Sequence, residues 1–109
     1  MADEGFDRLF AGVREFGWDP KKRESVLRDR DIDFDDAREV FNDYSFIRRS
    51  DRHGEIRYQV FGYVKGREIA VVCTLRGSLC RIISARRANY AERRKYYDRL
   101  SRLPRPGED

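Results

Sequence analysis

Two arginines, Arg57 and Arg81, have the clearest capacity for chemistry in this chain, and each lies in a segment that alternates apolar and polar residues. The turns predicted at Lys65-Gly66 and Arg76-Gly77 carry the glycine that two-residue hairpins favour, and the register they set puts both guanidinium groups on one sheet face. Planar guanidinium groups hold phosphate oxygens through paired hydrogen bonds and stabilise the charge that develops during phosphodiester cleavage. A pair of this kind can bind a phosphodiester, and an RNA substrate can supply its own 2′-hydroxyl as the nucleophile without a metal.

Further cations extend this predicted site along the chain. Arg86 and Arg87 follow Arg81 at the end of the same predicted strand, and Lys22 lies near the start of a predicted helix. Arginine is well suited to bidentate phosphate contacts. We therefore expect Arg86 and Lys22 to join Arg57 and Arg81 among the catalytic residues, and Arg87 to contact the RNA.

The general base is open between several residues. Glu55 lies on the same face as Arg57 by alternation and is included among the predicted catalytic residues, as the acceptor of the 2′-hydroxyl proton. His53, in the loop just before it, has the ordinary pKa best suited to proton transfer near neutrality. Tyr58 or Tyr96 could relay a proton if a neighbouring cation lowered its pKa. The sequence leaves this choice open.

Structural interpretations compete with these roles. Arg57 could simply pair with Glu55 or Glu68 across the sheet. Trp18 is a candidate platform for stacking an RNA base, and it could equally belong to the core. Both alternatives require coordinates to decide.

The last third of the chain is strongly basic. The formal net charge is +4 and the isoelectric point about 9.3, but nine Lys or Arg stand against two acids between Arg76 and Leu103. Residues 28–43 show the opposite bias, with seven acids against three arginines. A basic stretch attracts polyanions, so we expect Arg93 and Arg94 to bind RNA. The alternative is a solvated helix face without a ligand.

The elements that position these residues follow from capping and turn signals. Predicted helices begin at Asp19-Pro20, after Asp33, and at Asn89, where Glu92 completes a capping box. Predicted strands cover residues 13–18, 44–47, 55–64, 67–75 and 78–85. This order predicts an α+β fold in which helices cover one face of an antiparallel sheet and leave the other face open.

The length of 109 residues predicts one domain. We expect it to span residues 13–103, after an N-terminal extension of residues 1–12 and before a disordered tail of residues 104–109. The acidic start lacks the pattern of a signal peptide, and no apolar run is long enough to cross a bilayer. The expected location is the cytoplasm, without membrane contact.

The cysteines are expected to be free thiols. The predicted register puts Cys73 directly opposite Cys80, but a reducing compartment disfavours a disulfide. Together with His53 they form no metal-binding pattern. We expect neither a metal nor another cofactor.

Three motifs together resemble a known family. They are Trp18-Asp19-Pro20 with Lys22, then Gly54-Glu55-Ile56-Arg57-Tyr58, and finally the long run from Arg81 to Asn89 followed by Glu92. The last motif is the most specific. These segments resemble the BrnT toxins of bacterial toxin–antitoxin systems, over about residues 16–97.

The resemblance implies a RelE-like fold, a twisted antiparallel sheet of about four to five strands with two helices in the N-terminal half and a C-terminal helix. It also implies a ribonuclease that inhibits translation and is neutralised by a cognate BrnA-like antitoxin, a ribbon-helix-helix protein. The two proteins would form a heterotetramer that binds operator DNA through the antitoxin and represses its own operon.

The chain departs from the family pattern near the end of the first predicted helix. Asp29-Arg30-Asp31 stands where the family commonly has Lys-His-Gly, and Val26 stands where Asn is common. Tyr97 likewise stands in place of the usual Glu. These departures support an alternative, in which the chain is a non-catalytic module that binds nucleic acid or antitoxin and has lost ribonuclease activity.

Overall fold

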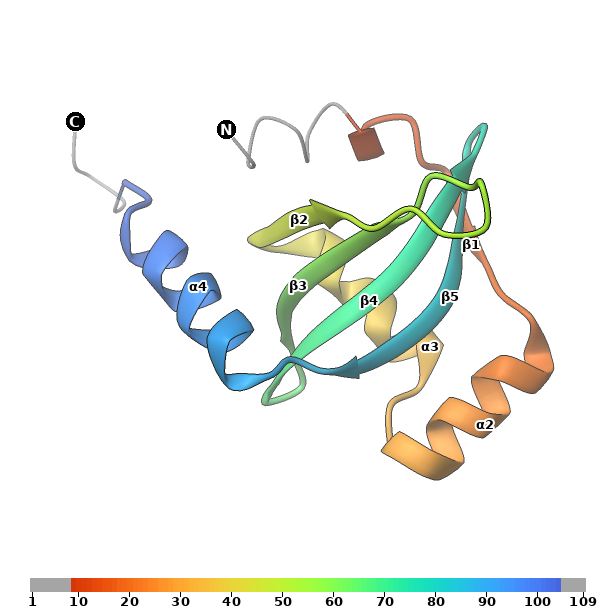
Figure 1. The fold of residues 1–109 in the computed structure, drawn as a ribbon, viewed down its shortest axis with the longest axis horizontal. Coiled ribbons are helices and arrows are strands. Elements are labelled where there is room, and N and C mark those ends of the chain that lie inside the picture. Colours follow the sequence, from red (N-terminus) through yellow and green to blue (C-terminus); the bar gives the residue numbers. More distant parts are fainter. Residues whose placement is uncertain (1–8, 105–109) are drawn as a thin grey trace.

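The computed structural model describes residues 9–104, and the fold it shows is α+β, as predicted (Figure 1). Five strands form one sheet in the order β1-β5-β4-β3-β2. The strands are β1 (Glu15–Gly17), β2 (Ser45–Arg49), β3 (Tyr58–Val64), β4 (Arg67–Arg76) and β5 (Leu79–Arg87). The helices are α2 (Pro20–Arg30), α3 (Phe34–Ala37), the 3₁₀ helix η1 (Arg38–Asn42) and α4 (Tyr90–Ser101). Most of the predicted N-terminal extension, residues 1–8, and residues 105–109 of the predicted tail lie outside the described residues.

The sheet is antiparallel except at one edge. β1 pairs with β5 in parallel, with Glu15 opposite Leu79. The sheet is therefore mixed, because the chain enters at this edge and crosses by way of α2, α3 and η1 to β2 at the other edge. The remaining strands follow as antiparallel neighbours, β3, β4 and β5 through two-residue turns and β2 and β3 through the longer connection of residues 50–57.

Local sequence signals explain where the helices begin and end. The Asp19 carboxylate accepts a hydrogen bond from the backbone N–H of Lys21, and Pro20 occupies the first helical turn. At the start of α4, Asn89 and Glu92 form the predicted capping box. These starts were predicted correctly because capping depends on near neighbours in the chain.

The turn between β4 and β5 differs from its prediction. Arg76 lies opposite Leu79, so the turn consists of Gly77-Ser78 rather than Arg76-Gly77. Gly77 has a φ of 60°, the left-handed conformation that glycine adopts at the first position of such a turn. The partners on β5 therefore shift by two residues, and Cys73 faces Ile82 instead of Cys80.

A shift of two residues preserves which face a side chain occupies, whereas a bulge reverses it. The register of β5 against β4 changes by one between Val72 and Cys73, which leaves Ile83 without a partner. Beyond this bulge Ala85 turns to the core and Arg86 to the opposite face, opposite Ala70.

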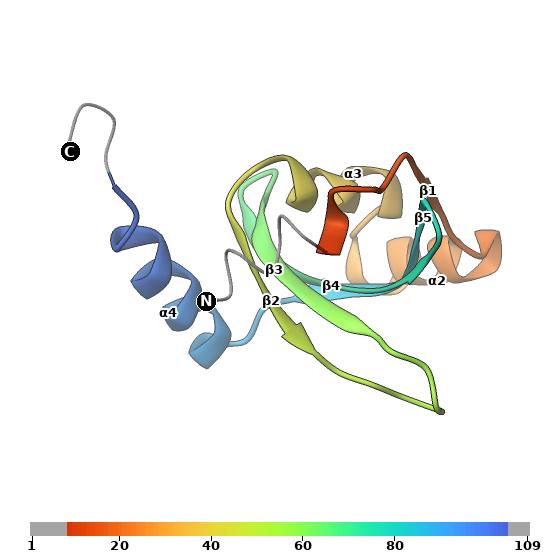
Figure 2. The same cartoon turned by 90° about the horizontal axis from the view of Figure 1, so that it is seen from above.

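The main core lies between the sheet and the helices α2, α3 and η1 (Figure 2). On the sheet side this core consists of Val60, Val64, Ile69, Val71, Cys73, Cys80 and Ile82, all buried. Alternation along the predicted strand of residues 55–64 would place Ile56 with them, but Ile56 is 47% exposed. The reason is that β3 begins only at Tyr58, so residues 50–57 form a long connection that leaves the plane of the sheet.

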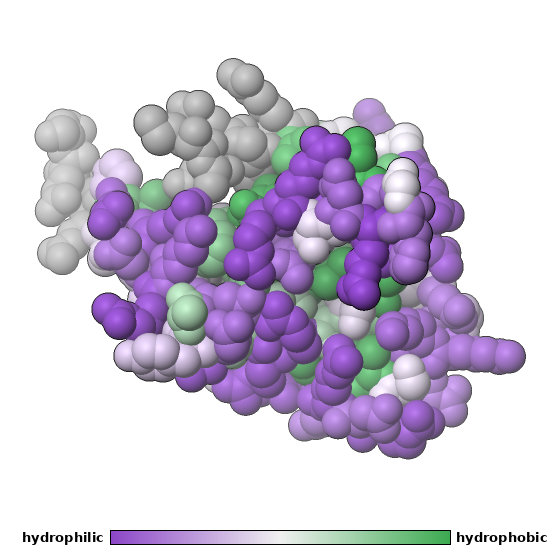
Figure 3. All heavy atoms as spheres, in the orientation of Figure 1, coloured by the Kyte–Doolittle hydropathy of each residue, from purple (hydrophilic) through white to green (hydrophobic). Residues whose placement is uncertain are grey.

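The opposite face is not fully open, which corrects the prediction. α4 packs over the end of the sheet near β2 and β3, where a second core joins Tyr96 to stacked Phe46 and Phe61 rings 4.6 Å apart. Two apolar side chains, Phe61 and Ala70, face each other here and need a cover. The uncovered remainder, toward β5, is hereafter the open face, and its surface is largely hydrophilic (Figure 3).

Both cysteines are buried and free. Burial and a hydrogen bond with Cys80 raise the pKa of the Cys73 thiol. Separately, no helix within residues 9–104 is long and apolar enough to cross a membrane.

Candidate active site

The sheet register brings Arg57 and Arg81 to the same face. Arg81 lies opposite Thr74 on β4. Arg57 lies one residue before β3, and its hydrogen bond to Glu55, which also accepts from Arg76 of β4, places it on this side of the sheet. Paired residues of adjacent strands share a face. The two predicted arginines therefore lie on the open face, on either side of Thr74.

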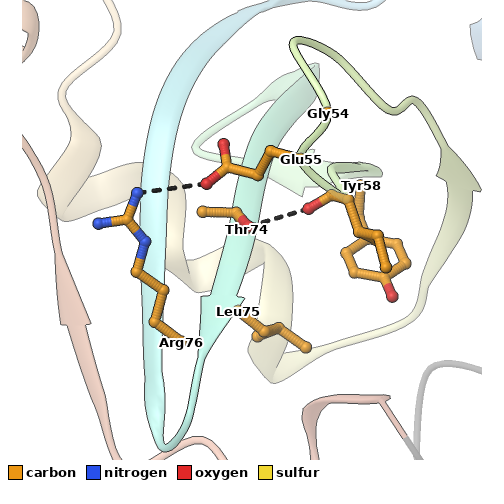
Figure 4. A pocket seen from close by; sticks show the side chains of 7 residues that line it. Gly54, Glu55, Tyr58, Thr74, Leu75 and Arg76 are labelled. Carbon is orange, nitrogen blue, oxygen red and sulfur yellow. Dashed lines mark hydrogen bonds and ion pairs between the residues drawn. The ribbon is translucent and has the colours of Figure 1, made fainter.

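A carboxylate lies between arginines at this end of the face. Glu55 accepts a hydrogen bond from Nε of Arg57 at 3.1 Å through one oxygen. Its other oxygen accepts from Nη2 of Arg76 at 3.2 Å (Figure 4). These hydrogen bonds, from Arg57 first and then Arg76, lower the pKa of Glu55. Glu55 is therefore an ionised, oriented carboxylate at neutral pH. We call Glu55, Arg57 and Arg76 the Glu55 cluster.

The Glu55 cluster borders a pocket of about 390 Å³. Its walls come from the end of the β2–β3 connection and from the end of β4, and they consist of Gly54, Glu55, Ile56, Tyr58, Thr74, Leu75 and Arg76. The Glu55 side chain is 31% exposed, so it is accessible from this pocket.

Hydrogen bonds to its backbone hold the end of the β2–β3 connection, which carries Glu55, in place. Thr74 is buried and donates its hydroxyl to the carbonyl oxygen of Ile56 at 2.9 Å. A small turn at His53 and Gly54, both with positive φ, links Arg52 to Glu55 through two backbone hydrogen bonds. These hydrogen bonds fix the backbone position from which the Glu55 side chain extends.

Arg81 differs from its neighbours in having no counterion. Its side chain makes no hydrogen bond or ion pair with any residue between 9 and 104. It is nevertheless only partly exposed, because β1 and β4 flank it on either side. A guanidinium group without a counterion, on a strand held between two others, is available to bind an anion.

Arg86, predicted to be catalytic, is instead neutralised. Its two terminal nitrogens donate to both oxygens of Glu92, at 2.8 and 2.9 Å, and Arg48 of β2 donates to the same carboxylate at 3.0 Å. Arg48 also donates to the side chain of Gln59. We call these four residues the Glu92 cluster.

Glu92 is almost fully buried, with 6% of its surface exposed, and hydrogen bonds led by that of Arg86 lower its pKa to about 2. The Glu92 cluster therefore ties the start of α4 to β2 and β5.

The other predicted residues lie apart from Arg57 and Arg81. Arg87 lies opposite Ile69, a core position, so alternation directs it to the side of the sheet away from Arg86. Trp18 packs edge-on against Phe34 at 6.1 Å, as part of the core. Lys22 is exposed at the start of α2, and its side chain makes no hydrogen bond or ion pair within the described range.

Arg93 and Arg94 lie on α4. Arg93 donates to the carbonyl oxygen of Ala88 at 2.7 Å, and Arg94 lies over the exposed ring of Tyr90, 5.8 Å from its centroid. Both border a second pocket, of about 430 Å³. His53, an alternative base, is exposed and joins neither cluster through a hydrogen bond or ion pair among residues 9–104.

Sequence reasoning missed several residues at this face. Arg76 was assigned to a turn, and the corrected register is what places it beside Glu55. Thr74 gave no signal beyond its place in a predicted strand, and Arg48 lay just outside the strand predicted for residues 44–47. Arg30 was noted only as a departure, yet it donates from Nη1 to the hydroxyl of Ser84 at 3.2 Å and to the carbonyl oxygen of Ala85 at 3.0 Å.

Between residues 9 and 104, no three His, Cys, Asp or Glu side chains are grouped so that they could hold a metal ion.

The fold and this face define a small α+β protein with a guanidinium-rich sheet surface. A family model described as "Ribonuclease toxin, BrnT, of type II toxin-antitoxin system" matches residues 18–92, and the chain belongs to this family. The crystal structure of the Brucella abortus ribonuclease toxin BrnT is similar, with a TM-score of 0.56 and 26% identity. That similarity covers 71% of this chain and 99% of the Brucella chain. No curated protein matches the chain.

The family match confirms the resemblance seen in the sequence motifs. It ends at Glu92, three residues into α4, so most of that helix and its basic residues lie beyond the matched region. Glu92, whose carboxylate binds Arg86, is the last residue of the matched region.

Proposed function

We propose that this BrnT family member is a metal-independent endoribonuclease that cleaves RNA at the Glu55 cluster and so inhibits translation. The observation that carries the proposal is the arrangement on the open face, where Arg81 has no counterion and an ionised Glu55 is oriented by Arg57 and Arg76. One group can accept a proton while the others stabilise negative charge, as phosphodiester cleavage requires.

In the proposed reaction Glu55 takes the proton of the RNA 2′-hydroxyl. The 2′-oxygen forms a bond to phosphorus, and the bond from phosphorus to the 5′-oxygen breaks. The products are a 2′,3′-cyclic phosphate and a 5′-hydroxyl, whose oxygen takes a proton from water. Arg81 and Arg57 hold the non-bridging oxygens as their charge increases.

The other predicted site residues act outside the Glu55 cluster in this proposal. Arg86 orients the end of β5 through Glu92, and Arg93 and Arg94 contact RNA away from the cleaved bond. The position of Lys22 and Arg87 away from the open face gives them the least geometric support. The same holds for Trp18 as a stacking platform.

The proposed partner is a BrnA-like antitoxin of the ribbon-helix-helix class. In this proposal the two proteins meet in the cytoplasm, form a heterotetramer, and repress their own operon through the antitoxin's contacts with operator DNA. Family membership supports the existence of an antitoxin. Co-expression with the product of an adjacent short reading frame should give a complex of defined mass, and the absence of such a reading frame would count against this partner.

The test is cleavage of a labelled RNA in excess EDTA. We expect a product ending in a 2′,3′-cyclic phosphate, and no cleavage where the substrate carries a single 2′-deoxy nucleotide at the cut position. Arg81→Ala should abolish most activity, whereas Arg102→Ala, which removes an exposed cation paired with Asp98 on α4, should not. RNA binding without any cleavage would instead support the non-catalytic alternative.

A further inference from the structure

Arg30 lies at the end of α2, and its side chain reaches the strand that carries Arg81. One terminal nitrogen, Nη1, bonds to the Ser84 hydroxyl and to the Ala85 carbonyl oxygen of β5. Ser84 lies opposite Val72, a position of the open face, just past the bulge at Ile83. Arg30 therefore approaches the open face around its edge, from the helix-covered side of the sheet.

These contacts use only part of the guanidinium group. Nε and Nη2 of Arg30 have no hydrogen-bond partner within residues 9–104. The neighbouring acids do not neutralise it either, since Asp29 pairs with Arg28, and the 94%-exposed side chain of Asp31 lies 3.9 Å from Arg67. The group is thus held on one side and available on the other.

The spacing along β5 links Arg30 to the proposed active site. Arg81 and Ser84 share a face and are three residues apart, at most about 10 Å along a strand. Two long arginine side chains at this spacing suit successive phosphates of one RNA strand. A guanidinium group fixed by a carbonyl oxygen also loses less conformational freedom when it binds an anion.

From this geometry we propose that Arg30 is a positioning residue that binds the phosphate next to the cleaved one, through Nε and Nη2. The inference rests on the proposed ribonuclease function and deepens it. It also gives a role to one departure from the family motif, because arginine carries its charge at every physiological pH while the histidine common in the family does not.

The test compares Arg30→Ala, Arg30→His and the control Arg28→Ala, which removes an exposed arginine from the same helical turn. For Arg30→Ala we expect KM to rise about tenfold, because a charge-assisted hydrogen bond to phosphate is lost, with kcat little changed. Arg28→Ala should match the wild type.

Arg30→His separates a phosphate contact from a merely structural one. The charged groups nearest position 30 are Arg28 and Asp29 on α2, Asp31 directly after it, and Arg67 of β4, which contacts residue 31. The ratio of its KM to that of the wild type should rise as pH passes from about 5.5 to 7.5, where the imidazole loses its charge. A structural contact alone would lower the melting temperature and leave this ratio flat.

The same variants are also measured for binding to a fully 2′-deoxy oligonucleotide, which cannot be cleaved by 2′-hydroxyl attack. Absence of cleavage by the wild type would overturn the proposed function, while weaker binding by Arg30→Ala than by Arg28→Ala would still support the phosphate contact. Equal KM and equal binding for these two variants would overturn the inference about Arg30.

Discussion

Two glutamates hold arginines on the same side of this sheet, and they differ in how far water reaches them. Glu92 has 6% of its surface exposed and binds Arg86 through two hydrogen bonds and Arg48 through a third. The Glu55 side chain is 31% exposed and borders a pocket, with Arg81 nearby and without a counterion. Similar side chains thus form one closed and one accessible cluster.

The difference separates a structural role from a chemical one. Each cluster sets two arginines against one carboxylate, so the charge balance within the two is the same. In the Glu92 cluster the carboxylate is buried, and its ion pairs hold α4 to the sheet. In the Glu55 cluster the carboxylate is accessible, and Arg81, on the same face, adds an arginine without a counterion. For this reason the proposed site is placed at Glu55 and not at Glu92.

The largest effect is expected at the proposed base. Glu55→Gln keeps the shape of the side chain but removes its basicity, so kcat/KM should fall roughly 10²- to 10⁴-fold. Glu24→Gln, a change at an exposed position of α2, is the control and should leave kcat/KM unchanged. If Glu55→Gln retains wild-type kcat/KM between pH 6 and 8, another group is the base, and His53 becomes the next candidate.

The second prediction concerns stability. Glu92→Gln leaves two arginines without their buried counterion, and the free energy of unfolding should fall by about 3 kcal/mol at neutral pH. The exposed pair of Asp98 and Arg102 in the same helix provides the control, because Asp98→Asn should cost less than about 1 kcal/mol. Equal losses in urea titrations of the two variants would remove the distinction between buried and exposed pairs.

The contribution of Glu92 to the free energy of unfolding should depend on pH. The folded-state pKa of Glu92 is about 2, below its ordinary value of 4.5, so its contribution is complete above the ordinary pKa and is lost as pH falls toward 2. The difference in unfolding free energy between wild type and Glu92→Gln should therefore be constant above about pH 5 and shrink between about pH 4.5 and 2. A difference that persists unchanged to pH 2 would contradict the assigned ion pairs.

A smaller effect is expected from Arg76→Ala. Arg76 helps Arg57 to lower the pKa of Glu55, so its removal should move the acid limb of the kcat/KM profile to higher pH. Arg102→Ala is again the control, and a limb that stays in place would show that Arg76 does not act on the base.

The smallest effect is expected at the end of α2. Asp31 has a φ of 58° and occupies the left-handed position that closes the helix, where the family commonly has glycine. Asp31→Gly should raise the free energy of unfolding by roughly 0.5 kcal/mol or slightly more, because glycine adopts this conformation without steric cost. Cleavage should not change, since Arg67 donates to the backbone oxygen of residue 31 rather than depending on its side chain. Thermal and urea unfolding would measure the gain, and a loss of stability would contradict this account of the helix end.

Local signals predicted much of the fold. The caps at Asp19 and Asn89 and the turn at Lys65-Gly66, with Val64 opposite Arg67, all depend on residues a few positions apart. Alternation predicted that Arg57 and Arg81 share a face. The error of two residues in the predicted register did not change this prediction, because a shift of two keeps each side chain on its face.

What the sequence could not predict depends on contacts between distant segments. No local pattern marks the bulge at Ile83, which turns Arg86 toward Glu92. The pairing of Arg86 with a residue of α4, and the reach of Arg30 to Ser84, arise only when separate elements pack together. The sequence therefore identified the arginines of this side of the sheet, but it did not show which of them form ion pairs.

The most direct test of the central claim compares Arg81→Ala with Arg86→Ala, measuring cleavage rate per folded molecule and melting temperature for both. The account predicts that Arg81→Ala loses about 10²- to 10³-fold in rate at an unchanged melting temperature. It predicts that Arg86→Ala melts several degrees lower and cleaves normally when folded. The reverse result, with cleavage lost at Arg86 and retained at Arg81, would contradict it.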